Sequence, residues 1–249
     1  MKPTSNTALI TGATSGIGHA FARQLAAEGY NLHLVARTES RLETAAEALV
    51  HEYGISVTTH AADLSTDAGI DTIAEVIATY PFNLVINNAG YGLSTSVLDA
   101  STEELRALEA IHVTAVQVLS HTAAHTMVER GYGGIITISS IASILSWGAY
   151  SAMKSASWVF MENLSAELRH TPVTATAVLP GLIATAFHDR TGQSMERVPR
   201  FAWVPVDAVV RTALADARRG KAVSIPGWQY KVAFHLGRRL PRWLTRRIR

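Results

Sequence analysis

The chain contains no cysteine, which excludes disulfide bonds and thiolate metal sites and fits a reducing compartment. It also lacks any apolar run of about eighteen residues, so no segment of the sequence is a candidate membrane-spanning helix. Charged residues make up only 17% of the 249 residues while hydrophobic residues make up 48%, a balance that excludes disorder and provides a sizeable core. The first strand follows Met1–Asn6 too closely for a signal peptide's apolar region. We therefore expect a soluble, cytoplasmic protein.

Acidic residues are missing from the end of the chain. Residues 231–249 hold seven basic residues and no acid, and removing these seven from the 22 basic residues leaves 15 against 20 acidic ones. The positive charge is thus a property of this tail, and we expect no nucleic-acid partner. Because the tail interleaves apolar and basic residues, it could contact an anionic membrane surface peripherally or pack against a partner subunit. A solvated C-terminal helix is the alternative.

Short apolar segments alternate with helical patterns along most of the chain. Such short strands, rich in Val and Ile, are typical of a parallel sheet covered on both faces. Their alternation with helices predicts a doubly wound α/β fold of about seven strands. No repeat or linker divides the pattern, so we expect one domain over residues 1–230 and then the tail, 231–249. The predicted strands cover residues 8–10, 31–36, 55–60, 82–86, 134–138, 173–179 and 222–225, and the predicted helices 17–28, 39–52, 67–79 and 102–129.

A glycine-rich turn follows the first strand and opens the first helix. Its glycines are spaced G-x-x-x-G-x-G, unlike the G-x-G-x-x-G of the general dinucleotide fingerprint. Glycine lets the backbone approach a pyrophosphate, whose negative charge is favoured at a helix N-terminus. The segment therefore predicts a dinucleotide phosphate site made by Thr11, Gly12, Thr14, Ser15, Gly16, Ile17 and Gly18.

The end of the second predicted strand indicates which dinucleotide binds. An acid there would bond the adenosine ribose of NAD, but Ala36 leaves that position without a carboxylate. Arg37 follows, with Arg41 one helical turn later, and an arginine there can pair with a 2′-phosphate. The pattern favours NADP(H). Asp63, after the third strand, is either an adenine contact or a helix N-cap.

Tyr150 and Lys154 are spaced to lie on one face of a helix. A phenol with a pKa near 10 is a poor base at neutral pH. A nearby ammonium, together with an oxidised nicotinamide, stabilises the phenolate and lowers the pKa of the phenol towards the working range. The pair therefore predicts a general acid/base.

Five segments occur together in the order and spacing of one known family: Thr11–Gly18, Asn87–Gly90, Ser139-Ser140, Tyr150-x-x-x-Lys154, and Pro180-Gly181 with Thr185. Over residues 7–190 the chain resembles the short-chain dehydrogenase/reductase family. The resemblance implies a single-domain Rossmann fold, a substrate lid near residues 182–205, a homodimer or homotetramer, and hydride transfer between nicotinamide and a carbonyl or alcohol. It also implies Ser140, Tyr150 and Lys154 as catalytic residues and further cofactor contacts at Asp63, Leu64, Asn88, Ala89, Gly90, Tyr150, Lys154, Pro180, Gly181, Ile183 and Thr185.

The chain departs from the family pattern at two places. Ser140 precedes Tyr150 by ten residues where the family usually has about thirteen, so its neighbour Ser139 stays a candidate for the same role. His112 occupies the place of the family's asparagine, which organises a water leading from the lysine to solvent. We count His112 among the catalytic residues, since its backbone can keep the family's role and its imidazole could relay a proton; a packed helix histidine is the alternative.

Large apolar residues occupy the segments that shape the family's substrate pocket. They favour a hydrophobic ketone or secondary alcohol as the small-molecule substrate. The alternative function, suggested by His112 and the short serine–tyrosine interval, is a catalytically impaired NADP(H)-binding sensor. The large apolar residues of these pocket segments are Tyr91, Leu93, Trp147, Leu182, Phe187 and Trp203.

Overall fold

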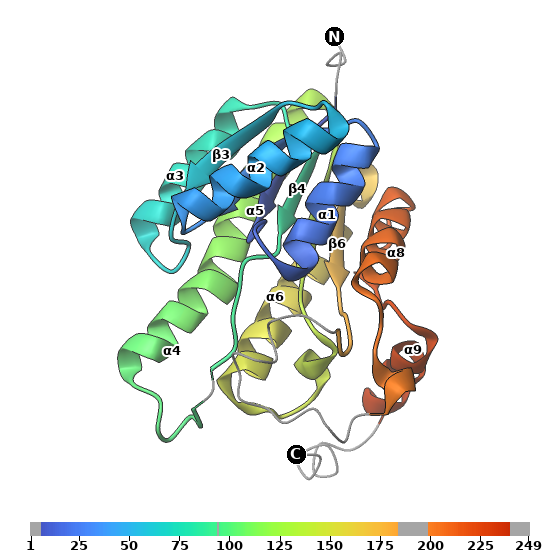
Figure 1. Ribbon diagram of the computed structural model, residues 1–249. Helices are drawn as coiled ribbons and strands as arrows, with labels where there is room; N and C mark the ends of the chain where they lie inside the picture. Colours follow the sequence, from blue (N-terminus) through green and yellow to red (C-terminus); the bar gives the residue numbers. More distant parts are fainter. Residues whose placement is uncertain (1–5, 94, 184–198, 240–249) are drawn as a thin grey trace.

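A computed structural model describes residues 6–93, 95–183 and 199–239 and shows one parallel sheet of seven strands (Figure 1). The strand order is β3-β2-β1-β4-β5-β6-β7, with the order reversing beside β1 as in a doubly wound fold. The predicted fold class is confirmed. The strands are β1 (Thr7–Thr11), β2 (Asn31–Ala36), β3 (Val57–Ala61), β4 (Leu84–Asn87), β5 (Gly133–Ile138), β6 (Val173–Val178) and β7 (Val223–Ser224).

Helices cover both faces of the sheet. Two clusters of buried side chains form the core: one packs α3, α5 and α6 on one face, and the other packs α1, α2 and α8 on the opposite face. Burial on both faces explains why the strands read as continuous apolar runs. The helices are α1 (Gly16–Ala27), α2 (Glu39–Tyr53), α3 (Asp67–Thr79), α4 (Thr102–Glu109), α5 (Ala115–Arg130), α6 (Gly148–Glu167), α8 (Val206–Arg218) and α9 (Trp228–Gly237), with short 3₁₀ turns at Ile141–Ile144, Leu168–His170 and Arg200–Ala202.

The helical stretch predicted over residues 102–129 is confirmed, but it changes type in the middle. A five-residue π-helix, Ala110–Thr114, separates α4 from α5. A π-helical turn adds a residue to the turn and redirects the side chains that follow, and such turns are frequent at functional sites. The periodic apolar pattern could not show this extra residue. His112 lies in this turn.

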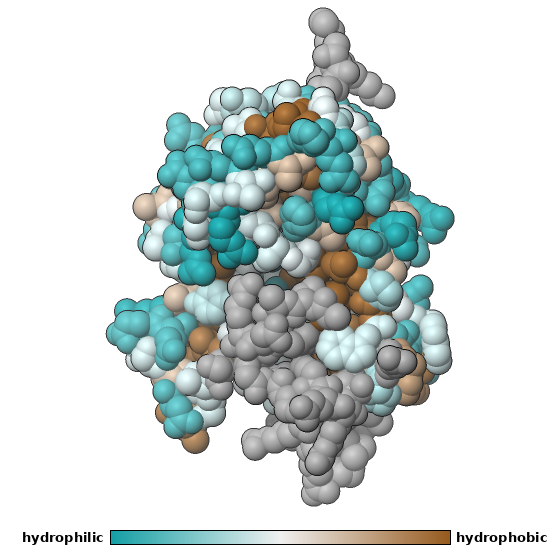
Figure 2. Space-filling view, viewed as in Figure 1, coloured by the Kyte–Doolittle hydropathy of each residue, from teal (hydrophilic) through white to brown (hydrophobic). Residues whose placement is uncertain are grey.

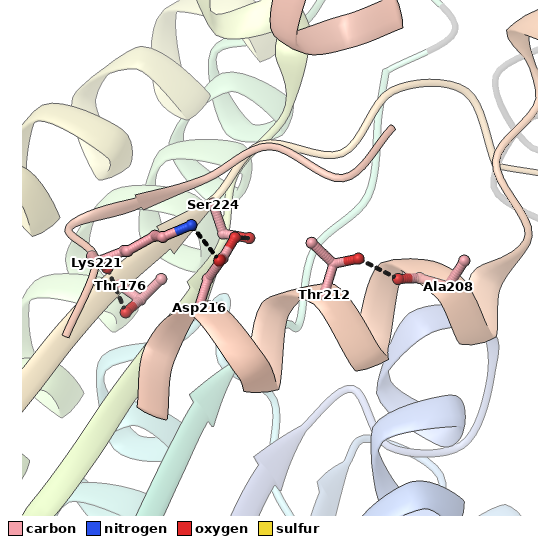
Figure 3. A network of polar contacts seen from close by, with 6 residues as sticks. All are labelled: Thr176, Ala208, Thr212, Asp216, Lys221 and Ser224. Carbon is pink, nitrogen blue, oxygen red and sulfur yellow. Dashed lines mark hydrogen bonds and ion pairs between the residues drawn. The ribbon is translucent and has the colours of Figure 1, made fainter. Parts of the chain in front are cut away.

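A polar network fastens the last strand to the fold (Figure 3). Asp216 on α8 is buried, accepts a 2.8 Å hydrogen bond from Ser224 of β7, and lies 2.6 Å from the Lys221 ammonium. Thr176 of β6 donates to the Lys221 carbonyl at 2.7 Å. A buried carboxylate needs such partners, so this network fixes the sheet edge from which the chain continues to α9.

The segments predicted to carry chemistry follow the carboxyl ends of β1, β2, β4, β5 and β6. In a doubly wound sheet these ends meet beside the strand-order reversal, where ligands bind. The boundary predicted between residues 230 and 231 falls within α9, and Phe234 beyond it is buried in the core. Two predicted site residues, Thr185 and Phe187, lie outside the described residues, as do most of the predicted lid and residues 240–249 of the tail.

Candidate active site

The turn after β1 forms a cradle whose glycines are required by geometry. Gly12 and Gly16 have φ of 66° and 56°, a region that residues with side chains rarely adopt. A Cβ on Gly18 would lie 2.3 Å from the Gly12 carbonyl oxygen, so Gly18 permits the close packing of α1 on the turn. The cavity is lined here by Gly12, Thr14, Ser15, Gly16 and Ile17.

Thr11 stands behind this cradle. Its buried hydroxyl accepts hydrogen bonds from the Asn88 and Ala89 amides at 2.9 and 3.0 Å. The Asn88 side chain in turn donates to the Thr11 carbonyl at 2.9 Å. Thr11 and Gly18 are therefore placed to hold the cradle, whereas we predicted direct cofactor contacts for both. Asn88, Ala89 and Gly90 themselves line the cavity.

The far end of the cavity holds the basic residues predicted after β2. Arg37 and Arg41 line it together with Ala36 and Leu64. Asp63 holds a turn beside this end: its Oδ1 accepts from the Ser65 amide at 3.0 Å and from the Ser65 hydroxyl at 2.7 Å. Burial raises the Asp63 pKa, but those two bonds and the Arg37 charge outweigh it, so the pKa is lowered. The α3 N-cap is Thr66, so Asp63 is not the predicted helix cap.

Ser140 and Tyr150 meet despite the short interval between them. The 3₁₀ turn Ile141–Ile144 folds the chain back compactly, and Tyr150 lies in the first turn of α6. The two side chains are hydrogen-bonded to each other. The Ser139 hydroxyl, by contrast, donates to the Lys154 carbonyl at 2.8 Å. The geometry thus selects Ser140, rather than Ser139, as the serine beside the tyrosine.

Lys154 is buried beneath Tyr150, one helical turn further along α6. Its Nζ donates to the Ile138 carbonyl at 2.6 Å and lies 5.8 Å from the centre of the Tyr150 ring. Burial lowers the Lys154 pKa to about 7. Burial also raises the Tyr150 pKa to about 12, and the Ser140 hydrogen bond lowers it only in part. In the protein alone desolvation of the phenolate exceeds the attraction of its neighbours, whereas the predicted lowering of the Tyr150 pKa included the charge of an oxidised nicotinamide.

His112 fills the space beneath Gly90 and Tyr91. Its imidazole is 1% exposed and meets the Tyr150 ring edge-on, with 5.5 Å between centroids. Nε2 lies 2.7 Å from the Tyr91 carbonyl oxygen and 3.3 Å from the Tyr91 amide nitrogen; because a carbonyl oxygen can only accept, the shorter contact assigns the proton to Nε2. Among the described residues, Nδ1 has no hydrogen-bond partner. Burial, and then the Lys154 charge, hold the His112 pKa well below its usual value, so the ring is neutral.

Gly90 makes this arrangement possible. A Cβ at Gly90 would lie 2.3 Å from the His112 Cε1 atom. The His112 imidazole thus supports the segment around Gly90, which lines the middle of the cavity. The π-helical turn directs the imidazole towards that segment. No sequence pattern links Gly90 to His112, since they are far apart in the chain.

Tyr230 on α9 is a site residue that the sequence did not reveal. Its hydroxyl accepts from the Leu182 amide at 3.0 Å and donates to the Ala202 carbonyl at 2.7 Å. A Cβ on Gly181 would lie 2.0 Å from the Tyr230 ring, so Gly181 leaves room for it. Tyr230 therefore braces the wall made by Pro180, Gly181, Leu182 and Ile183. No motif around Tyr230 could have indicated this role from the sequence.

The glycine cradle, Arg37 and Arg41, His112, and the Ser140–Tyr150–Lys154 group border one cavity of about 360 Å³. The sequence model of the short chain dehydrogenases matches residues 6–196 of this chain. The chain belongs to the short-chain dehydrogenase family. The fold of this short-chain dehydrogenase brings together segments that carried the resemblance, namely the glycine-rich turn, Ser140, Tyr150 and Lys154.

Relatives extend over nearly the whole of this short-chain dehydrogenase. A very-long-chain 3-oxoacyl-CoA reductase from Scheffersomyces stipitis is 30% identical over 92% of this chain and 70% of its own length. A short-chain dehydrogenase from Sphingobium yanoikuyae, solved with NADPH, is 29% identical with a TM-score of 0.86, covering 93% of this chain and 91% of that one. A bulky-bulky ketone specific alcohol dehydrogenase from Comamonas testosteroni is 26% identical with a TM-score of 0.82, covering 99% and 96%.

Proposed function

We propose that this short-chain dehydrogenase is an NADP(H)-dependent reductase of a hydrophobic ketone, with Tyr150 as the proton donor. The observation that carries the proposal is the Ser140–Tyr150–Lys154 group in one cavity with the glycine cradle. A nucleotide sensor has no need for a hydrogen-bonded serine and tyrosine above a buried lysine. The group therefore favours catalysis over the sensor hypothesis.

The residues at the far end of the cavity fit NADP(H). Gly12 and Gly16 let the backbone approach a pyrophosphate at the start of α1. Arg37 and Arg41 line the end where the adenosine 2′-phosphate would lie, and Ala36 offers no carboxylate to repel it. The relative from Sphingobium yanoikuyae was solved with NADPH, which supports this choice.

The bound cofactor would supply a hydride from its nicotinamide. Ser140 is placed to donate a hydrogen bond to the substrate carbonyl oxygen, and Tyr150 to transfer its phenol proton to that oxygen. Hydride on carbon and proton on oxygen together give the alcohol and leave a phenolate. The Lys154 ammonium, held by the Ile138 carbonyl, stabilises that phenolate.

The pKa of Tyr150 fits the role of a proton donor. A phenol with a pKa of about 12 stays protonated at neutral pH and so is ready to donate. Lys154, with a pKa of about 7, is charged in only part of the molecules at neutral pH and gains its proton below it. Carbonyl reduction is therefore expected to be faster on the acidic side of neutrality than on the alkaline side.

The cavity wall beside Tyr150 supports an apolar substrate. Tyr91, Leu93, Ile141, Trp147 and Leu182 line it. Such a wall favours bulky ketones or acyl chains over polyhydroxylated sugars. The names of the relatives, a ketone-specific alcohol dehydrogenase and a 3-oxoacyl-CoA reductase, agree with that class.

The test is NADPH oxidation at saturating cofactor with aryl ketones, 3-oxoacyl-CoA esters of increasing length and a ketose as the polar control. We expect turnover that rises with the apolar size of the substrate and is negligible for the ketose. NADPH binding without turnover on any carbonyl would contradict the proposal and support the sensor. The homo-oligomer and the cytoplasmic location stay predictions; size-exclusion chromatography with light scattering and cell fractionation test them.

A further inference from the structure

One face of α9 carries large apolar side chains that are exposed to solvent. Trp228, Val232 and Leu236 are 74%, 51% and 59% exposed. They are spaced four residues apart, so at roughly 100° per residue they form one stripe along the helix. We call these three residues the α9 stripe. A single exposed leucine is ordinary, but three in register on one helix indicate a contact surface.

The opposite face of α9 is fixed to the protein, so the stripe is not a product of a loosely attached helix. Phe234 is buried and meets the Trp158 ring at 5.4 Å between centroids. Tyr230 makes the two hydrogen bonds to Leu182 and Ala202 described above. The rigid docking of this face leaves the stripe directed outward.

Basic residues border the stripe. Lys231 and Arg239 are exposed, and Arg238 lies over the Trp158 and Phe234 rings at 5.6 and 5.4 Å, between the stripe and the core. The sequence has no acid after Asp216, and residues 240–249 add further arginines. The surface thus combines apolar side chains with a positive rim.

The same end of the molecule holds the cavity. Figure 1 places α9, the N-terminal end of α6 and the loop before α4 at the end towards which the strands run. Exposed Phe201 adjoins α9, since its carbonyl accepts a 3.0 Å hydrogen bond from Gln229. In Figure 2 hydrophobic residues gather below α1, towards this end of the molecule, whereas the surface over α2 is mostly hydrophilic.

We propose that the α9 stripe docks on the surface of an anionic lipid bilayer. A second copy of this chain is disfavoured as the occupant, because a two-fold contact would bring Lys231, Arg238 and Arg239 of both copies together. Aromatic and aliphatic side chains beside lysine and arginine are the pattern of helices that lie in the membrane interface. Among the described helices none could span a bilayer, so the contact is peripheral.

Vesicle flotation tests this proposal with the full-length protein. We expect the protein to float with phosphatidylcholine vesicles that contain phosphatidylserine and to stay in solution with phosphatidylcholine alone. Replacing the whole stripe (W228S, V232S and L236S together) should lower the floated fraction about tenfold or more, because the apolar insertion is lost. Raising the salt concentration should weaken the binding of the unaltered protein, because the electrostatic attraction is screened.

The matched control is Val159→Ser, which changes a valine on α6 that is 57% exposed and lies outside the stripe. It should float like the unaltered protein, and both variants should unfold at the same urea concentration as it. Equal flotation of the triple variant, or no flotation with phosphatidylserine vesicles, would overturn the proposal. Light scattering could instead show that the triple substitution converts an oligomer into smaller species. That result would also overturn the proposal, because it would make the stripe a contact with a second copy of this chain. None of these outcomes depends on catalytic turnover.

Discussion

Exchanging His112 for asparagine tests whether the imidazole supports the site or moves protons. The variant loses the 2.7 Å hydrogen bond to the Tyr91 carbonyl and part of the packing under Gly90. A net hydrogen bond contributes about 1 kcal/mol, and the lost packing adds to this, so we expect the free energy of unfolding to fall by about 1–3 kcal/mol. Urea unfolding measures this loss.

Catalysis should suffer less than stability. Nε2 already donates to a backbone carbonyl and the buried ring is neutral, so we expect the imidazole to support the site and not to relay protons. We therefore expect kcat/KM for carbonyl reduction to fall less than tenfold, which is under about 1.4 kcal/mol in the barrier. Because the His112 pKa is already far below neutrality, the pH profile between about 6 and 9 should keep its shape.

The control for this exchange is His121→Asn, which changes an exposed histidine on α5 and should alter neither property. A loss of several hundredfold in kcat/KM, or the disappearance of one limb of the pH profile, would refute the supporting role. It would make the imidazole part of the proton path.

Three further predictions concern the cofactor end, the sheet edge and acid stability. Arg37→Ala should raise the KM for NADPH about 10–100-fold and change that for NADH little, because one charge-assisted contact to the 2′-phosphate is lost; paired steady-state kinetics measure both. Asp216→Ala should lower the free energy of urea unfolding by about 2–4 kcal/mol, because Ser224 and Lys221 lose their buried partner. The control Asp207→Ala, on the same helix, should lower it by less than about 0.5 kcal/mol. Burial, and then the charge of His60, lower the pKa of His33 from 6.5 to about 4. The neutral His33 ring therefore contributes stability that is fully present above pH 6.5 and is lost as the pH falls towards 4. That difference corresponds to roughly 3 kcal/mol, and replacing His33 with Leu should flatten the fall in urea-unfolding free energy between pH 7 and pH 4.5.

Much of the fold follows from local patterns, because each strand is an apolar run and each crossover a helical period. The prediction for 31–36 matches β2, and that for 67–79 matches α3. The helical stretch predicted over 102–129 is confirmed, but the apolar spacing did not reveal the π-helical turn within it.

The same limit applies to the site. Glycine spacing and the Tyr150–Lys154 interval are local, so the sequence could show them. The choice between Ser139 and Ser140, the turn held by Asp63 and the bracing by Tyr230 depend on segments that meet only after folding. The direction of the Tyr150 pKa shift likewise depends on burial, which no spacing reveals.

The most direct test of the proposed reductase is the Tyr150→Phe variant, compared with the unaltered protein for NADPH binding and for reduction of the best ketone substrate. Removal of one hydroxyl should leave the dissociation constant for NADPH within about threefold, since the cradle and Arg37 are untouched, and should lower kcat by about a thousandfold or more because the proton donor is gone. Reduction at near the original rate by the phenylalanine variant would contradict the central claim.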